Sequence, residues 1–188
     1  MRIVAGRLKG RRLEAPAGRD IRPTADRTRQ ALFDVLEHGH LTEDGGSALV
    51  DAIVLDAFCG TGALGFEALS RGAAEATFMD INNAALDCAR ANGKALSVSA
   101  NFILADARNP PRGRKPATLL FLDPPYGGAL GGPALAGLRE AGWIAPSAIV
   151  SLEMSGPELS RFAAPDGFEA IDERRYGKAR IVLLRAGF

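Results

Sequence analysis

The chain has 188 residues, of which 47% are hydrophobic and 24% are charged, and its formal net charge is +1. This length can bury the core of one domain with a small appendage, and the composition is that of an ordinary globular protein. No run of about 18 apolar residues indicates a membrane span, basic residues interrupt any signal-peptide core, and Cys59 and Cys88 lack the spacing of a metal site or disulfide framework. We therefore expect a cytoplasmic protein without a metal, acting as a monomer.

Positive charge is concentrated at the N-terminus. Residues 1–29 hold nine Lys and Arg against three Asp and Glu, a balance of +6, which leaves −5 for the remaining 159 residues. A basic segment on a slightly acidic body indicates a docking surface for a polyanion, and a solvated tail is the alternative. Apolar residues near Ile3 and Leu13 flank turn residues at Gly6 and Gly10, which favours a short hairpin over a tail.

The chain then changes from a helix to alternating strands and helices. Thr24 can cap a helix over residues 24–38, in which apolar residues recur at helical spacing. From residue 52 onward we expect strands at 53–55, 77–79, 102–104, 119–122 and 148–152, helices at 83–95 and 133–141, and a glycine-rich turn that enters a helix over residues 60–71. Two more strands, at 168–174 and 179–184, form a final hairpin. This alternation predicts an α/β sheet with an antiparallel edge.

A glycine-rich turn follows the strand at 53–55. Glycines allow a ligand to approach the backbone closely, and the amides at the start of the next helix supply hydrogen-bond donors. The spacing Gly60-x-Gly62-x-x-Gly65 also matches the dinucleotide fingerprint, with Asp80 about 20 residues further on, where a ribose ligand is expected. The turn by itself therefore fits both a nicotinamide enzyme and a methyltransferase.

Three acidic residues at successive strand ends favour the methyltransferase. Asp56 directly precedes the turn, where it can face the amine of S-adenosylmethionine (SAM) but would repel a pyrophosphate. Asp80 can accept from both ribose hydroxyls, and Asp106 can accept from the adenine amino group. Helix caps or solvated turns are the alternative interpretation of these residues.

The apolar strand at 119–122 ends in Asp123-Pro124-Pro125-Tyr126, and open α/β sheets bind ligands at such strand ends. An exocyclic base amine is a poor nucleophile because its lone pair is delocalised into the ring. Hydrogen bonds from its N–H groups to the Asp123 carboxylate and the Pro124 carbonyl favour the reactive form, and the two prolines fix the backbone. Tyr126 offers a ring for stacking a base that has left its helix. The tetrapeptide predicts amine methylation; a simple turn is the alternative.

The sequence also resembles a known family. The loop at residues 56–62 together with DPPY is similar to class I N-methyltransferases. The N-terminal motifs RIVAG, KGR and RPTADRTR, with ALGFEALSRGA after the glycine loop, resemble the bacterial RsmD family. These motifs and DPPY together span essentially the whole chain, and the N-terminal signature is the most selective of them.

The resemblance implies a Rossmann-like class I methyltransferase fold, with a mostly parallel seven-stranded sheet, an antiparallel C-terminal hairpin and a small N-terminal β-hairpin and helix extension. Residues 1–40 would form a basic extension that docks RNA and packs on the core, and residues 41–188 the methyltransferase domain. The cofactor would be SAM. The reaction would methylate N2 of a guanine in 16S rRNA, presented as RNA or in a small-subunit assembly intermediate.

The motif positions carry over to this chain residue by residue. Base contacts are expected at Asp123, Pro124, Pro125 and Tyr126. Cofactor contacts are expected at Asp56, Phe58, Gly60, Gly62, Asp80, Ile81, Asp106 and Ala107. Phosphate contacts are expected at Arg7, Lys9, Arg11, Arg12, Arg22, Arg27 and Arg29. A second basic cluster, Arg174, Arg175, Lys178 and Arg180, either extends this RNA surface or is an ordinary charged turn.

Other functions stay open at this point. Adenine-N6 methyltransferases of DNA or RNA and glutamine-N5 methyltransferases use similar chemistry after the fourth strand, and guanine N2 is preferred through the resemblance alone. A nicotinamide-dependent oxidoreductase shares the glycine spacing. A non-catalytic RNA-binding assembly factor could keep the fold, although the presence of Asp123 and both prolines argues against it.

Overall fold

A computed structural model describes residues 1–15, 23–42 and 44–188 of the protein. Its elements, in chain order, are η1 (Gly6–Leu8), α1 (Pro23–His38), β1 (Ile53–Ala57), α2 (Ala63–Ser70), β2 (Glu75–Asp80), α3 (Asn83–Leu96), β3 (Asn101–Leu104), β4 (Ala117–Leu122), α4 (Gly131–Glu140), β5 (Ile144–Ser155), α5 (Gly156–Leu159), β6 (Phe168–Tyr176) and β7 (Ala179–Ala186). Arg22 lies outside the described residues, and the predicted cap at Thr24 falls on a side chain that is not described either.

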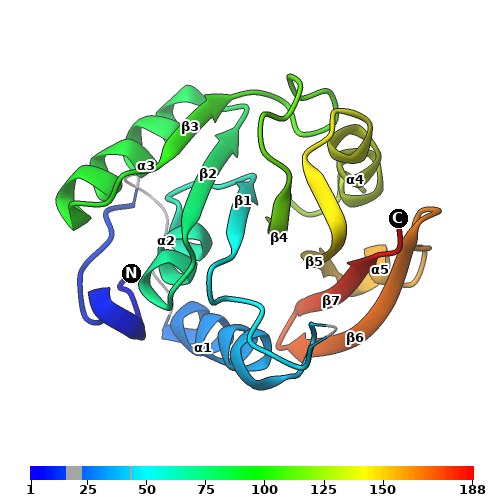
Figure 1. The fold of residues 1–188 in the computed structure, drawn as a ribbon, viewed down its shortest axis with the longest axis horizontal. Coiled ribbons are helices and arrows are strands. Elements are labelled where there is room, and N and C mark those ends of the chain that lie inside the picture. The colour runs from blue at the N-terminus through cyan, green and yellow to red at the C-terminus, as the bar shows by residue number, and fades with distance from the viewer. Residues whose placement is uncertain (16–22, 43) are drawn as a thin grey trace.

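The strands form one seven-stranded sheet in the order β3-β2-β1-β4-β5-β7-β6 (Figure 1). The strands from β3 to β5 are parallel, and β7 pairs antiparallel with both β5 and β6. This architecture confirms the predicted Rossmann-like fold. The strand order reverses between β1 and β4, and ligands of open α/β sheets bind where the order reverses, at the carboxyl ends of the strands.

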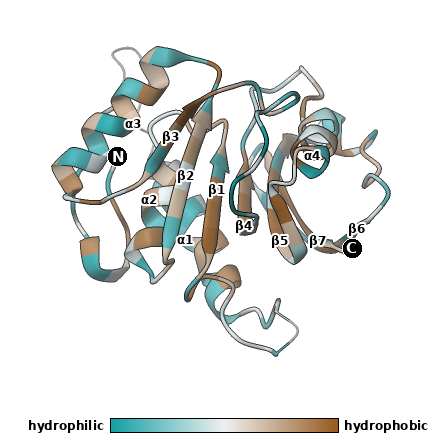
Figure 2. Ribbon diagram, turned by 45° about the horizontal axis from the view of Figure 1, so that its top comes forward, coloured by the Kyte–Doolittle hydropathy of each residue, from teal (hydrophilic) through white to brown (hydrophobic). Residues whose placement is uncertain are grey.

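Helices cover both faces of the sheet. The side chains of β4 alternate between two cores: Leu119 and Phe121 pack with α1, α2 and α3, whereas Leu120 and Leu122 pack with α4. Both faces of this strand are therefore apolar, as its sequence predicts. Figure 2 shows the result, with apolar central strands and helix α3 alternating between apolar and hydrophilic positions.

The N-terminal extension packs on the α2 side of the sheet. Its two arms run antiparallel, with Ile3 N donating to Arg11 O at 2.9 Å and Gly10 N donating to Ile3 O at 2.9 Å. The arms meet in a single bridge, Arg2↔Arg12, and the turn between them is η1. The predicted hairpin is therefore present in a short form. Ile3, Leu8 and Leu13 join the core of α1, α2 and α3, which fixes the extension to the domain.

Some boundaries differ from the predicted ones. Helix α2 begins at Ala63, after the predicted glycine-rich turn, in which Gly60 and Gly62 have φ values of 54° and 79°. Strand β5 is longer than predicted, and the short α5 that follows it was not expected. Within the described ranges, no helix is long and apolar enough to cross a membrane.

Candidate functional site

The turn after β1 has an unusual backbone. Phe58, Gly60 and Gly62 all have positive φ values, of 65°, 54° and 79°. The turn is held by Cys59, whose N–H donates to Met79 O at 3.0 Å. A Cβ at Gly62 would lie 2.6 Å from Cε2 of the Phe66 ring, so packing as well as conformation requires glycine there.

Asp56 is the penultimate residue of β1, just before this turn. Its side chain is 2% exposed, and its Oδ2 accepts from Gly65 N at 2.9 Å in the first turn of α2. Burial raises the pKa of Asp56 well above its ordinary value, and the negative charges of Asp123 and Asp80 act in the same direction. The carboxylate that we expected to face a ligand amine thus braces the start of α2 from the interior.

Asp80 is fixed at the carboxyl end of β2. Its Oδ2 accepts from Gly60 N at 2.9 Å and its Oδ1 accepts from Asn82 N at 2.8 Å. Each carboxylate oxygen has capacity for a further hydrogen bond. Asp80 is half-buried and next to the glycine turn, so its carboxylate suits a pair of ribose hydroxyls.

Exposed apolar side chains gather at the same edge. Ile81, Leu104 and Tyr126 are 65%, 56% and 52% exposed, and they follow or end β2, β3 and β4. Leu104 was not among the predicted residues, although it pairs with Asp80 as the last residue of β3. Exposed apolar surface beside convergent polar groups is typical of a site for flat rings such as adenine.

Asp106 and Ala107 are less open than expected. Asp106 Oδ1 accepts from the backbone N of Arg108 at 2.9 Å, and the Arg108 guanidinium pairs with the carboxylate at 2.5 Å. This pairing lowers the pKa of Asp106. Ala107 is 3% exposed and packs in the α4-side core. An adenine amine at Asp106 would therefore share the carboxylate with Arg108.

The structure brings DPPY next to the glycine turn. Ala57, the last residue of β1, pairs with Leu122, the last residue of β4. Phe58 and Asp123, the next residues along each strand, therefore lie at the same edge of the sheet. Asp123 and Tyr126 are both exposed there. Pro124 is buried, which fixes the backbone between them.

Two carboxylates that the sequence interpretation missed hold the loop after DPPY. The Tyr126 hydroxyl donates to Glu153 Oε1 at 2.5 Å. Glu158 Oε1 accepts from Gly127 N at 2.8 Å and from Ala129 N at 3.3 Å. Both had a signal: Glu153 lies at the carboxyl end of β5, and Glu158 completes a capping box on α5 with Ser155.

The basic residues of the N-terminal part divide into two groups. Arg7, Lys9, Arg11, Arg12 and Arg27 are exposed. Arg29 is 5% exposed: it donates to Arg2 O at 2.5 Å and pairs with Asp26 at 2.8 Å and with the fully buried Glu67 at 3.6 Å. Its expected phosphate contact is replaced by contacts that fasten the extension to α1 and α2.

The tip of the N-terminal extension contacts the C-terminal end of α2. Leu8 N donates to Ser70 Oγ at 2.9 Å, at the last residue of α2. The glycine turn is at the other end of this eight-residue helix, about 12 Å away at 1.5 Å per residue. The tip of the extension and the glycine turn therefore lie at opposite ends of α2.

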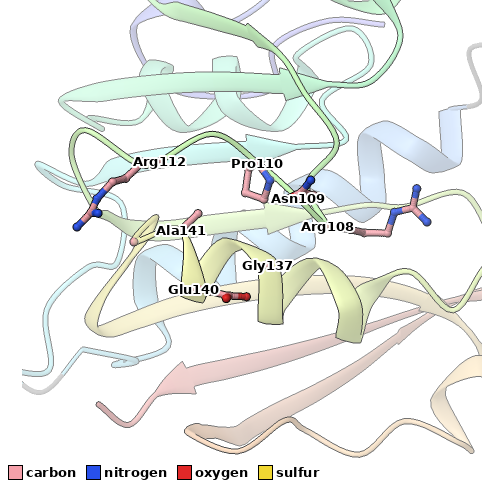
Figure 3. A pocket seen from close by; sticks show the side chains of 8 residues that line it. Arg108, Asn109, Pro110, Arg112, Gly137, Glu140 and Ala141 are labelled. Atoms are coloured by element: carbon pink, nitrogen blue, oxygen red, sulfur yellow. The ribbon is translucent and has the colours of Figure 1, made fainter.

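A separate hollow of about 400 Å³ lies between the loop after β3 and the C-terminal part of α4 (Figure 3). Its lining includes Arg108, Arg112 and Glu140. The loop is anchored there by Gly113 N, which donates to Ala141 O at 2.8 Å, near the start of β5. The hollow contains none of the predicted site residues.

Comparison with known proteins agrees with this architecture. A family model described as "Conserved hypothetical protein 95" matches residues 1–185. Ribosomal RNA small subunit methyltransferase D of Escherichia coli is 35% identical over 159 residues, covering 81% of this chain and 74% of the relative.

Solved structures match over the whole chain. The protein yhhF of Escherichia coli has a TM-score of 0.83 and 31% identity, and HI0767 of Haemophilus influenzae has a TM-score of 0.75 and 27% identity. Both matches cover 100% of this chain and 98% of the other. With the family model over nearly its full length and a relative at this identity, the chain belongs to the RsmD family, that of ribosomal RNA small subunit methyltransferase D.

Proposed function

We propose that this chain transfers a methyl group from SAM to N2 of a guanine in the 16S rRNA of the small ribosomal subunit. The observation that carries the proposal is the pairing of Ala57 with Leu122, because it sets the DPPY loop beside the glycine turn. A donor site and an amine site at one sheet edge are what methyl transfer needs. The name of the Escherichia coli relative supports small-subunit rRNA as the substrate.

The residues at the edge fit SAM. We assign the ribose hydroxyls to Asp80 and the adenine ring to the exposed side chains of Ile81 and Leu104. The turn from Phe58 to Gly62, next to the start of α2 that Asp56 braces, would take the amino-acid portion. When bound, SAM supplies an electrophilic methyl group on its sulfonium sulfur.

The protein's own part in the chemistry is to position and polarise the base. The Asp123 carboxylate and the Pro124 carbonyl accept hydrogen bonds from the two N–H groups of the exocyclic amine, which directs the nitrogen lone pair away from the ring. Tyr126 stacks on the base, and its hydroxyl stays on Glu153. Orientation and preorganised hydrogen bonds of this kind are the expected sources of rate.

The basic extension would supply affinity for RNA. We propose residues 1–40 as the docking part and residues 41–188 as the catalytic domain. The phosphate contacts are assigned to exposed residues: Arg7, Lys9, Arg11, Arg12 and Arg27. Such contacts give affinity and orientation without reading the sequence.

Methylation with labelled SAM tests the proposal. The protein is incubated with small-subunit rRNA, either free or in partly assembled subunits, and the RNA is digested and its nucleosides are identified by mass spectrometry. N2-methylguanosine is the expected product. N6-methyladenosine would show that the target is an adenine amine instead of guanine N2. Label found on a protein glutamine and not on RNA would show a glutamine methyltransferase, and RNA binding without transfer would indicate an assembly factor.

A further inference from the structure

A second basic surface lies at the turn between β6 and β7, which we call the C-terminal basic turn, residues 174–180. Its sequence, RRYGKAR, contains four basic residues and no acidic residue. Arg175 and Lys178 are exposed, and neither has an ion pair within the described part of the chain. Arg174 is paired with Asp172 at 2.7 Å, so the available charge is that of Arg175, Lys178 and Arg180.

The register places this turn at the edge that carries DPPY. Leu122 pairs with Leu152, and Leu152 pairs with Val182, so β7 lies two strand spacings, or about 10 Å, from β4. Ala179, at the start of β7, pairs with Ser155. The turn therefore extends about 10 Å, or three strand residues, past the level of Leu152.

Hydrogen bonds connect the C-terminal basic turn to the loop that follows DPPY. Ser155, opposite Ala179, donates its N–H to Glu158 Oε2 at 2.9 Å. The other oxygen of Glu158 accepts the N–H groups of Gly127 and Ala129, directly after Tyr126. The C-terminal basic turn and the loop after DPPY are thus both attached to residues 155–158, which fixes their relative position.

The cross-strand pairing inside the turn points to an anionic ligand. Arg175 pairs directly with Arg180, and like charges opposite each other destabilise an antiparallel ladder. Arg180 turns back, and its Nη1 donates to the carbonyls of Gly177 and Ala179 at 3.0 Å each. The N-terminal extension also places two arginines opposite each other, Arg2 and Arg12, and there Asp26 lies 4.0 Å from Arg2. A phosphate between two such arginines relieves the repulsion.

We propose that the C-terminal basic turn binds the RNA backbone next to the target nucleotide, with Arg175, Arg180 and Lys178 as phosphate contacts. The inference rests on the proposed function, since RNA is its ligand. It assigns the turn a different task from that of the N-terminal extension. The extension reaches RNA at the far end of α2, whereas the turn holds the strand where one base must leave its stack.

The test compares two double variants that remove the same charge. Arg175→Ala with Lys178→Ala changes the basic turn, and Arg112→Ala with Arg114→Ala changes the loop before β4. That loop lies at the amino-terminal edge of the sheet, where Ala117 N donates to Trp143 O at 2.7 Å. Binding of small-subunit rRNA is measured between 50 and 200 mM salt, together with kcat, the KM for RNA and the affinity for S-adenosylhomocysteine.

The turn variant should bind RNA about tenfold or more weakly at low salt, and the slope of log K against log salt should fall by about 1 to 2, roughly one for each lost contact. Its KM for RNA should rise by a similar factor, and its affinity for S-adenosylhomocysteine should stay at the wild-type value. Its Tm should equal or exceed that of the wild type, because one repelling arginine is gone. The loop variant should change none of these quantities.

Two outcomes would overturn the inference: unchanged RNA affinity and slope in the turn variant, or an equal loss in both variants. The proposed function fails separately, when wild-type protein transfers no methyl group to any RNA. In that case the binding measurement still decides whether the turn contacts RNA.

Discussion

The hydroxyl of Tyr126 donates to Oε1 of Glu153 at 2.5 Å and so ties the loop after β4 to the neighbouring strand β5. Burial of the hydroxyl, the hydrogen bond and the negative charges around it raise the pKa of Tyr126, so the phenol stays a donor at physiological pH. The side chain as a whole is still 52% exposed. The tyrosine is therefore held by its far end while ring surface remains open for a base.

Replacing Tyr126 separates the stacking from this hydrogen bond. Tyr126→Ala removes the ring and should lower kcat/KM for RNA by about 5- to 150-fold, since stacking on one base contributes about 1–3 kcal/mol. Tyr126→Phe keeps the ring and loses one hydrogen bond of about 0.5–1.5 kcal/mol, so it should cost at most about tenfold. Steady-state kinetics of both variants measure the difference, and a larger loss in the Phe variant would contradict stacking.

Asp123 should be needed for the reaction and not for the cofactor. Asp123→Ala should lower kcat by about 10²- to 10³-fold, the loss typical of removing one preorganised transition-state hydrogen bond. Calorimetric titration with S-adenosylhomocysteine should give the wild-type affinity. Asp87→Ala, which removes an exposed carboxylate paired with Arg90 on α3, is the matched control and should keep kcat within about twofold. A wild-type kcat in the Asp123 variant would contradict the assigned role of its carboxylate in binding the target amine.

Glu158 should order the loop after DPPY. Hydrogen bonds from Ser155 and from the N–H groups of Gly127 and Ala129 lower the pKa of Glu158 to about 2. Because this pKa is lowered, the ionised Glu158 and its hydrogen bonds stabilise the loop at any pH above the ordinary pKa of a glutamate. This stabilisation is lost only as the pH falls towards 2. Glu158→Gln should therefore speed hydrogen exchange at Gly127 and Ala129 and raise the KM for RNA, at every pH from 5 to 9.

Ser155→Ala is the control for that experiment. It removes the hydroxyl that donates to Glu158 Oε2 at 2.6 Å and leaves Oε1 on the loop. Its exchange rates at Gly127 and Ala129 should stay close to those of the wild type. Equal exchange in both variants would show that the loop is ordered by something other than Glu158.

Asp56 should make stability depend on pH. Its folded-state pKa is raised by burial, so its contribution to stability is fully present below its unfolded pKa of about 3.9 and is lost as the pH rises through the folded value. Asp56→Asn can still accept from Gly65 N and carries no buried charge. The variant should have the higher Tm at pH 8, by about 2–4 °C for each 1 kcal/mol gained. The advantage should shrink towards pH 4; a constant difference would contradict the assignment.

The sequence predicted the strands, the two motifs and their meeting at one sheet edge, because apolar runs and strand-end positions are local signals. It did not predict what each charged group contacts. Arg29 reads as one more basic residue of the extension, yet the fold buries it against Glu67, 38 positions away. Asp106 reads as an open acceptor, yet Arg108 occupies it. The Arg29–Glu67 contact depends on packing between distant elements, and the Asp106–Arg108 contact depends on the local turn after β3. Hydrophobic periodicity encodes neither.

Glu67 is the residue that joins the N-terminal extension to the domain, and its removal should release the extension. This fully buried carboxylate accepts from Val4 N at 2.8 Å and Ala5 N at 3.0 Å, and it pairs with Arg71 at 2.9 Å and Arg29 at 3.6 Å. Glu67→Ala leaves both arginines with less counter-charge in the interior, so unfolding should become easier by about 3–5 kcal/mol, as for other broken buried pairs.

Limited proteolysis and denaturant unfolding of this variant measure the two effects. Cleavage within residues 1–15 should become faster, and RNA affinity should fall because the arms that carry Arg7 and Arg12 lose their attachment. Glu75→Ala is the matched control: it breaks an exposed pair with Lys115 and should cost at most about 1 kcal/mol. If Glu67→Ala bound RNA as tightly as this control despite its lower stability, the extension would not need to be docked in order to hold RNA, and its arginines would act as a flexible arm.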